Sequence, residues 1–282
     1  MYKNLSPGAI GIGANLAESV CLAREHGFAG VDISIEEVAQ IAEAQSVEAV
    51  RALLGEVRPG GWALPLDWRA EESKFREGLA QLPRYARLGQ AIGADRVTMW
   101  LLPYSDELPF AENFRFHVAR FTPIAQVLAD HGCRLGLEFI GPQTLRNGKR
   151  YGFIHTLDGM LALCAAIGDN VGLLLDAWHW YTSHGTLAEL DHLTNAQVVY
   201  VHVNDAPAGI AVDEQVDNVR CLPGETGVID LPGFLRKLAA IGYDGPVTPE
   251  PFSAKLREMT PEQAARTTAA ALDQMWQAAG LA

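Results

Sequence analysis

Four short apolar segments, each ending in a residue that can bind a metal ion, constrain this sequence more than any other feature. Residues 171–175 are apolar throughout and are followed at once by an aspartate, and three further segments of this kind end near residues 138, 202 and 250. A parallel strand that is buried on both faces reads as a near-continuous apolar run, so each segment is predicted to be such a strand. The residues at the four strand ends are Glu138, Asp176, His202 and Glu250.

Strands of this type alternate with helical segments along the whole chain, which has 282 residues. Strands are expected at residues 9–14, 30–35, 62–66, 96–101, 135–139, 171–175, 198–203 and 247–250. Helices are expected at residues 16–25, around 47–54, and at 71–92, 113–129, 156–167, 187–190, 231–240 and 261–278. Eight strands that alternate with helices predict one α/β domain, residues 1–282, folded as a (β/α)8 TIM barrel. In such barrels the active site lies at the carboxyl ends of the strands, where the four candidate ligands fall.

Composition and charge exclude several classes of function. The formal net charge of −12 argues against a nucleic-acid partner, because phosphate binding depends on clustered Lys and Arg. No run of about 18 apolar residues is present, so no membrane span is expected. The amino-terminal residues show no secretory signal and the four cysteines are scattered, which together favour a cytoplasmic protein with reduced thiols. We expect a small-molecule partner, and contacts through the barrel helices would allow a homo-oligomer.

Three carboxylates and one imidazole form an oxygen-rich site without thiols. Such a set suits one divalent metal ion, with Mn²⁺ expected and Mg²⁺, Co²⁺ or Zn²⁺ as alternatives. The ion would act as a Lewis acid on the carbonyl of a hydroxy-ketone and stabilise the enediolate that forms when the neighbouring carbon loses a proton. Glu138 and Glu250 are the candidate catalytic acid and base. The alternative for each acid is a structural one, because an acid at a strand end often caps the next helix or pairs with an Arg.

Several motifs resemble the xylose isomerase-like TIM-barrel superfamily of sugar phosphate isomerases and epimerases, and within it the inosose isomerases and the tagatose and psicose 3-epimerases. The motifs are L-E-F at Glu138, L-D-A-W-H from Asp176, V-H-V-N-D from His202, R-C-L-P-G-E-T-G from Arg220 and P-E-P-F at Glu250. The resemblance implies that Glu138, Asp176, His202 and Glu250 bind the metal and that the two glutamates transfer protons. It also implies that His179 and Arg220 contact substrate oxygens.

Two stretches depart from the family pattern. Basic residues are inserted at 146–150, which would bind a phosphate or carboxylate of the substrate or form a solvated loop. The loop after residue 176 is rich in aromatic residues. Trp178 in this loop and Trp100, which lies elsewhere, are candidate substrate-binding residues in the wall of the site, and ordinary packing is the alternative. Arg220 lies in a long segment, residues 205–227, that is expected to cover the mouth of the barrel.

Two related reactions fit these residues. The first is isomerisation or epimerisation of a ketose or a cyclic keto-polyol such as an inosose. The second is a lyase or dehydratase reaction, in which a keto-inositol or a 3-keto-glycoside loses a β-leaving group. Abasic-site endonucleases share this fold, but the acidic chain lacks the basic tract that they need.

Overall fold

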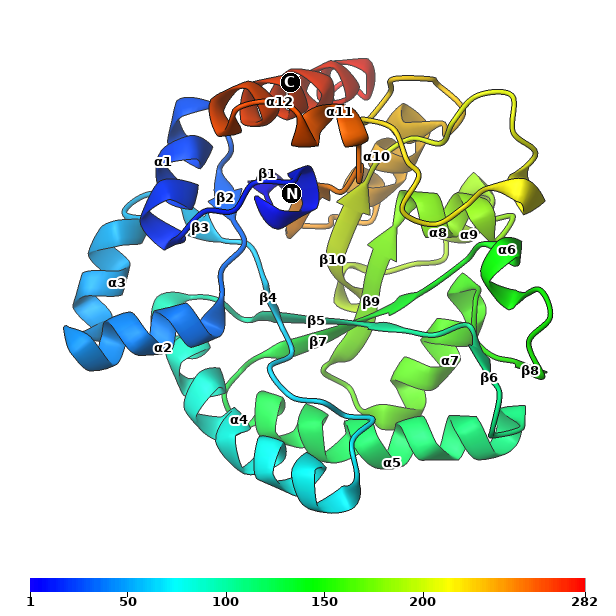
Figure 1. Cartoon of the computed structure of the whole chain (residues 1–282), viewed down its shortest axis with the longest axis horizontal. Helices are drawn as coiled ribbons and strands as arrows, with labels where there is room; N and C mark the ends of the chain where they lie inside the picture. Colours follow the sequence, from blue (N-terminus) through cyan, green and yellow to red (C-terminus); the bar gives the residue numbers. More distant parts are fainter. Residues whose placement is uncertain (282) are drawn as a thin grey trace.

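The centre of the structure, a computed structural model that describes residues 1–281, is a curled sheet of parallel strands surrounded by helices (Figure 1). The strands follow one another in space in the order β3-β2-β1-β11-β10-β9-β7-β5-β4. Their bounds are β1 (Tyr2–Leu5), β2 (Gly30–Val31), β3 (Arg58–Pro59), β4 (Trp62–Ala63), β5 (Arg96–Leu101), β7 (Arg134–Phe139), β9 (Val171–Asp176), β10 (Val198–Val203) and β11 (Pro246–Pro249).

The sheet closes on itself because β3 and β4 belong to one extended segment. β3 pairs with β2 and β4 pairs with β5, and only Gly60 and Gly61 separate the two. The Cβ of a larger residue at position 61 would lie 2.7 Å from the ring of Tyr200, so glycine lets this strand approach the barrel interior. The nine short strands therefore occupy eight positions around the barrel, and the predicted TIM-barrel fold is confirmed.

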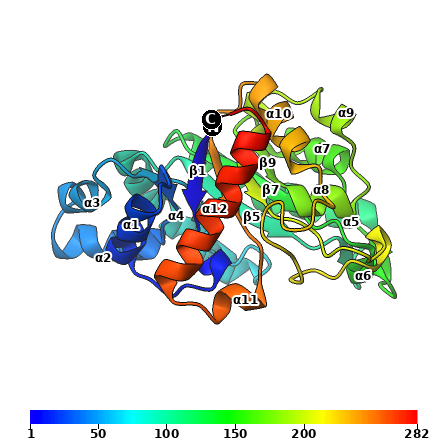
Figure 2. The same ribbon diagram turned by 90° about the horizontal axis from the view of Figure 1, so that it is seen from above.

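Helices cover the outside of the barrel. They are α1 (Leu16–Glu25), α2 (Ile35–Ala44), α3 (Val47–Leu54), α4 (Glu72–Ile92), α5 (Phe110–Ala129), α6 (Gln143–Arg146), α7 (Leu157–Ile167), α8 (Ala177–Thr182), α9 (Leu187–Leu190), α10 (Leu231–Ala240), α11 (Ala254–Arg257) and α12 (Pro261–Ala278). The last long helix, α12, packs beside α1, so the ring of helices also closes (Figure 2). A short antiparallel pair, β6 (Tyr104–Ser105) and β8 (Tyr151–Gly152), lies outside the barrel. Within residues 1–281, no helix is long and apolar enough to cross a membrane.

Local sequence explains where the main helices begin and what the strands bury. Asn15 caps α1 and Thr260 caps α12, each in a capping box with the residue three positions later. The side chains of Leu135, Leu137 and Leu173 are fully buried, as expected for strands covered on both faces. The apolar core therefore runs from the barrel wall to the inner faces of the helices.

One predicted strand is wrong. Residues 9–14 were expected to form the first strand, but Gly8–Ile10 is a 3-10 turn and Gly11 has the left-handed φ of 80° that ends it. The first strand is instead Tyr2–Leu5, which pairs with β11 and β2. The helix expected around residues 47–54 is present as α3, and a further helix, α2, precedes it.

Candidate active site

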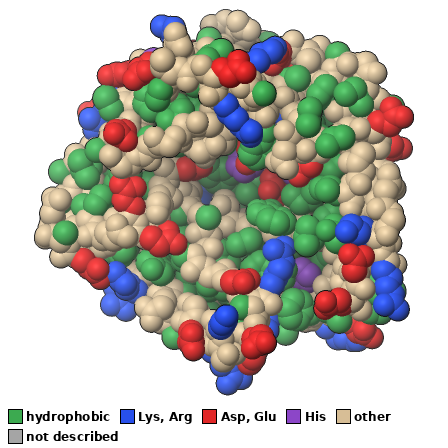
Figure 3. Space-filling model, in the orientation of Figure 1, with side chains coloured by type: hydrophobic (Ala, Val, Ile, Leu, Met, Phe, Trp, Pro, Cys, Tyr) green, Lys and Arg blue, Asp and Glu red, His purple; other side chains and the backbone are tan. Residues whose placement is uncertain are grey.

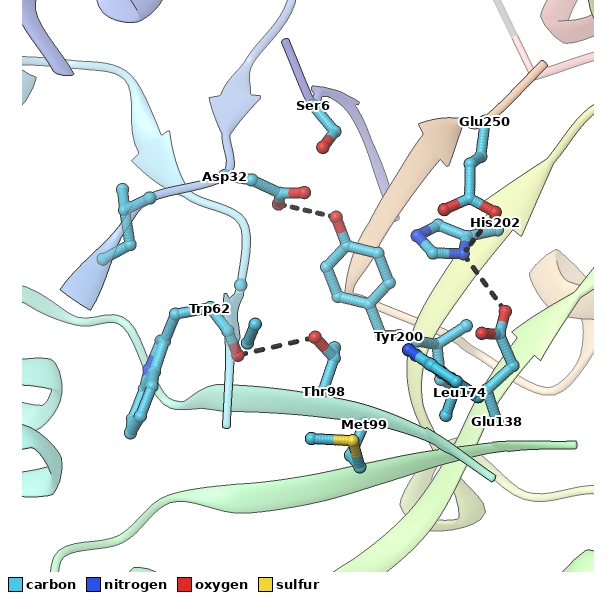
Figure 4. Close-up of a pocket in the computed structure, with 14 residues that line it drawn as sticks. Ser6, Asp32, Trp62, Thr98, Met99, Glu138, Leu174, Tyr200, His202 and Glu250 are labelled. Carbon is cyan, nitrogen blue, oxygen red and sulfur yellow. Dashed lines mark hydrogen bonds and ion pairs between the residues drawn. The ribbon is translucent and has the colours of Figure 1, made fainter. Parts of the chain in front are cut away.

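The structure brings the four predicted metal ligands together at the carboxyl ends of adjacent strands. Glu138 lies in β7, Asp176 ends β9, His202 lies in β10 and Glu250 directly follows β11. One ligand atom from each side chain lies within 4.8 Å of the others. Figure 3 shows that acidic and histidine side chains lie at the base of a central hollow, and Figure 4 shows three of the four ligands at close range.

The imidazole of His202 lies among three carboxylates. Its Nδ1 is 3.3 Å from Glu138 Oε1, 3.4 Å from Glu250 Oε2 and 3.8 Å from Asp176 Oδ2. Burial lowers the pKa of His202, but the carboxylates, Glu250 above all, outweigh burial and raise this pKa to about 10. Burial also raises the pKa of Glu250 to about 8. The cluster thus retains protons that a divalent cation would replace, and its donor set fits such an ion.

Asp176 caps a helix and pairs with an Arg, which is the structural alternative that the sequence offered, and it also lies in the candidate ligand cluster. Its Oδ1 accepts hydrogen bonds from the backbone N–H of Trp178 at 2.6 Å and of His179 at 3.3 Å, and so caps α8. The same oxygen accepts from the amide of Asn204 at 3.2 Å. Its Oδ2 faces Arg220 and His202. Burial tends to raise the pKa of Asp176, but the nearby Arg220 guanidinium outweighs burial and lowers it.

Arg220 is buried beside the ligands. Its Nη1 donates to Asp176 Oδ2 and to Glu250 Oε2, both at 2.8 Å, and its Nη2 donates to Asp217 Oδ1 at 2.9 Å. Its guanidinium lies over the rings of both Trp178 and Phe252, 4.8 Å from each ring centroid, and so contacts two aromatic faces. The charge of Arg220 balances part of the negative charge of the carboxylate cluster.

The long segment that carries Arg220 is organised by Asp205. Oδ1 of this buried residue accepts from the backbone N–H of Ile229, and its Oδ2 accepts from those of Thr226 and Gly227. The backbone of Asp205 also pairs with that of Cys221. Asp205 is thus a loop anchor, and its hydrogen bonds set the position from which Arg220 reaches the cluster.

The other candidate substrate-binding residues lie in two different environments. Trp100 is 47% exposed and lines the cavity beside the ligands. His179 is buried behind the cluster, with Nε2 3.0 Å from Arg220 Nη2. Trp178 is fully buried and contacts Arg220 rather than the cavity. The basic insert at residues 146–150 also lies away from the cavity, and Lys149 there pairs with Asp106.

The cavity next to the ligands has a volume of about 350 Å³ and reveals residues that the sequence analysis missed. Asp32, Ser6 and Thr98 contribute polar groups to its wall, and Tyr200 joins them from β10. A weak signal for Asp32 existed, because it directly follows the apolar end of β2 as the other acids follow their strands. The lining residues are Ser6, Asp32, Ile33, Gly61, Trp62, Ala63, Thr98, Met99, Trp100, Glu138, Leu174, Tyr200, His202 and Glu250.

Comparison with known proteins gives relatives of two kinds. An inosose isomerase from Halalkalibacterium halodurans is 25% identical over 202 residues, which cover 70% of this chain and 67% of that protein. A 3-dehydroshikimate dehydratase from Pseudomonas aeruginosa is 37% identical over 106 residues, which cover 37% of this chain but only 16% of that protein.

Solved structures match over almost the whole length of the chain. A xylose isomerase domain protein from Alicyclobacillus acidocaldarius has a TM-score of 0.89 and 34% identity, with 99% of each chain covered. The IolI protein, solved with a bound zinc atom, has a TM-score of 0.80 and 20% identity, with 99% of this chain and 98% of that chain covered, and shows the shared fold. The xylose isomerase-like TIM barrel family matches residues 20–275. The chain therefore belongs to the xylose isomerase-like TIM barrel family.

Proposed function

We propose that this protein is a divalent-metal-dependent isomerase or epimerase of a ketose or a cyclic keto-polyol such as an inosose. The observation that carries the proposal is the pair of glutamates, Glu138 and Glu250, which contact the same imidazole nitrogen and line one cavity. The relatives named inosose isomerase support the choice of substrate class. The cytoplasmic location and the homo-oligomer expected from the sequence stay predictions.

The proposed ligands of the ion are Glu138, Asp176, His202 and Glu250, whose donor atoms already lie within 4.8 Å of one another. A bound Mn²⁺ or related divalent ion supplies Lewis acidity that polarises the carbonyl of the substrate. The protein fixes the ligands through contacts behind them. Asp176 is oriented by the backbone of α8, and Glu250 by the guanidinium of Arg220. Such supporting contacts keep ligand atoms in place before the substrate binds.

The two glutamates divide the proton transfers. Glu138 extends from β7 and Glu250 follows β11, so their carboxylates reach the cavity from different strands (Figure 4). We propose that one removes the proton from the carbon next to the carbonyl and that the other returns a proton on the opposite face. A bound ion would displace the proton that burial favours on Glu250, so this carboxylate could then accept a proton from carbon.

Deuterium exchange tests the reaction. The protein loaded with Mn²⁺ is incubated in deuterated water with an inosose, with ketohexoses and with 3-keto-glycosides, and the products are followed by NMR. We expect deuterium to enter the carbon next to the carbonyl in substrate and product without loss of total sugar. If no compound exchanges a carbon-bound proton, the assignment of the glutamates as acid and base is wrong.

A second candidate is a dehydratase or lyase that expels a β-hydroxyl or a glycosidic oxygen after the same proton is removed. The match to a 3-dehydroshikimate dehydratase favours this candidate, although it covers about a third of the chain. The same experiment separates the two reactions. A dehydratase would release water and give an unsaturated ketone that absorbs in the ultraviolet, and an isomerase would not.

A further inference from the structure

A second polar group, built around Asp32, lines the cavity across from the four ligands. Figure 4 shows Ser6 and Asp32 on one side of Tyr200, and Glu138, His202 and Glu250 on the other. These residues all contribute to the wall of one cavity. A substrate that fills this cavity from the ligands across Tyr200 therefore meets Asp32.

Hydrogen bonds from behind fix the orientation of the Asp32 carboxylate. Its Oδ1 accepts from the phenol of Tyr200 at 2.6 Å and from Nδ2 of Asn4 at 2.8 Å. Asn4 also donates to the hydroxyl of Thr248 at 2.9 Å, and this hydroxyl lies 2.6 Å from that of Tyr200. Asn4 and Thr248 are fully buried and Tyr200 is 1% exposed, so the network is rigid and closed to solvent.

These hydrogen bonds determine which oxygen of Asp32 is available to a ligand. The bonds from Asn4 and Tyr200 both end on Oδ1, so Oδ2 is the oxygen left to accept a hydrogen bond from a ligand. The hydroxyl of Ser6, which also interacts with this carboxylate, lies on the same stretch of wall. Burial raises the pKa of Asp32, but the two hydrogen bonds that Tyr200 and Asn4 donate to Oδ1 favour the ionised form, in which Oδ2 accepts hydrogen bonds and cannot donate them. This part of the cavity therefore favours a ligand group that donates a hydrogen bond, such as a sugar hydroxyl.

The charges around Asp32 disfavour an anionic ligand. No Lys or Arg side chain within residues 1–281 lines this cavity, and the ionisable side chains that line it include Asp32, Glu138, His202 and Glu250. A phosphate or carboxylate placed beside Asp32 would be repelled by a like charge, and no Lys or Arg of the described cavity wall would compensate it. The basic insert at residues 146–150, which the sequence offered for an anion, does not line this space.

We propose that Asp32 is the specificity-determining residue of this site. It accepts a hydrogen bond from a free hydroxyl on the part of the substrate that lies across Tyr200 from the four ligands, and so selects substrates that carry neither phosphate nor carboxylate there. This inference rests on the proposed function, because it takes a polyhydroxylated ketone as the ligand. It deepens that function by assigning the chemistry of the distal end of the substrate.

The change Asp32→Asn tests the inference without removing the network. Tyr200 and Asn4 both donate to position Oδ1, so the amide oxygen of the variant takes that place and the amide NH2 replaces Oδ2. An acceptor that faces the ligand thus becomes a donor, and a negative charge is lost. The matched control is Asp106→Asn, which removes an acid on the surface that pairs with Lys149.

Binding of myo-inositol and of its monophosphates to the Mn²⁺-loaded protein is measured by calorimetry. A hydrogen bond to a charged group contributes about 1.5–3 kcal/mol, so Asp32→Asn should bind inositol about 10-fold to 100-fold more weakly. The same variant should bind at least one inositol monophosphate more tightly than the wild type does. Asp106→Asn should change neither affinity. If Asp32 had a purely structural role, Asp32→Asn would bind both inositol and its monophosphates more weakly, and that result would overturn the proposal.

Measurements on the wild type keep the inference testable if Asp32→Asn does not fold, as judged by circular dichroism. At least one monodeoxy-inositol should bind about 10-fold or more weakly than inositol, and equal binding of every analogue would refute the hydroxyl contact. Turnover of inosose separates the two proposals. The crossed change in affinity is weaker binding of inositol together with tighter binding of an inositol monophosphate in Asp32→Asn. If turnover is absent but this crossed change is found, the proposed reaction fails and the role of Asp32 stands. If turnover is present without the crossed change, the role of Asp32 fails alone.

Discussion

The change Arg220→Met tests whether the carboxylate cluster requires a cation. The guanidinium is 2.8 Å from both Asp176 and Glu250, and the side chains of Arg220 and Asp176 are only 2% and 0% exposed. Methionine is unbranched and apolar, so it can keep contact with the rings of Trp178 and Phe252 while it removes the charge. The variant therefore leaves the buried Asp176 and the partly buried Glu250 without their nearest permanent cation.

The size of the effect follows from burial. Removing one partner of a buried ion pair costs about 3–5 kcal/mol, because the remaining charge is left uncompensated. We expect the free energy of unfolding of Arg220→Met to fall by about this amount in EDTA. A divalent ion bound by Asp176 and Glu250 supplies the missing positive charge, so the loss should be much smaller in saturating Mn²⁺.

Equilibrium urea denaturation, with EDTA and with Mn²⁺, measures the two values. Lys149→Met is the matched control, since its ion pair with Asp106 is 3.4 Å long and partly exposed, and such pairs contribute about 0–1 kcal/mol. The control should lose little stability in either condition. If Arg220→Met loses the same free energy with and without the ion, then Arg220 and the ion do not neutralise the same carboxylates, and the reasoning is refuted.

Three further predictions concern neighbouring residues. Glu138→Gln and Glu250→Gln should each lower kcat by at least about 1,000-fold. One of the two variants should still exchange the substrate proton with deuterated water. Near-normal turnover with metal bound would contradict the acid and base roles. Without metal, the free energy of unfolding should fall as pH rises from about 6.5 towards 10. The pKa of His202 is raised from 6.5 to about 10 in the fold, so its proton stabilises the fold fully below pH 6.5, and this stabilisation is lost as the pH rises to about 10. A urea midpoint that stays constant from about pH 6 to 9 would contradict this prediction. Phe252 has a φ of 42°, so in Phe252→Gly the relief of backbone strain should offset the loss of the ring, and the free energy of unfolding measured with urea should fall by less than about 1 kcal/mol. Because this ring contacts Arg220, kcat/KM of the same variant should fall about 10-fold, and Phe252→Tyr should keep the wild-type kcat/KM.

The strands that form one half of the barrel could be predicted from local sequence. β5 and β10 have the predicted bounds, and β7 and β9 differ from prediction by one residue at one end. These strands are mostly apolar, and β7, β9 and β10 are buried on both faces. This pattern has few alternatives. The metal-ligand candidates stand out for the same reason, because a polar residue that ends an apolar strand interrupts a clear pattern.

The other half of the barrel could not be predicted in the same way. The strand predicted at residues 30–35 is present only as the two residues of β2. β1 contains Lys3 and the buried Asn4, so it does not read as an apolar run and was not predicted. Asn4 is buried because its amide bonds to Asp32, Tyr200 and Thr248, which come from three other places in the chain. A polar residue that is satisfied by such distant partners looks like a surface residue in the sequence alone.

The loop after β9 shows why one motif can supply a candidate metal ligand while its aromatic residue lies away from the cavity. The Oδ1 of Asp176 accepts the backbone N–H of Trp178, and this hydrogen bond begins α8 directly at the end of the strand. The ring of Trp178 is fully buried and faces Arg220, not the cavity. The sequence alone cannot tell a tryptophan that packs on a buried cation from one that stacks on a sugar, since both use an aromatic face. The polar wall that meets the substrate is therefore expected to come from Asp32 and Tyr200, which are placed by long-range hydrogen bonds and carry no local motif.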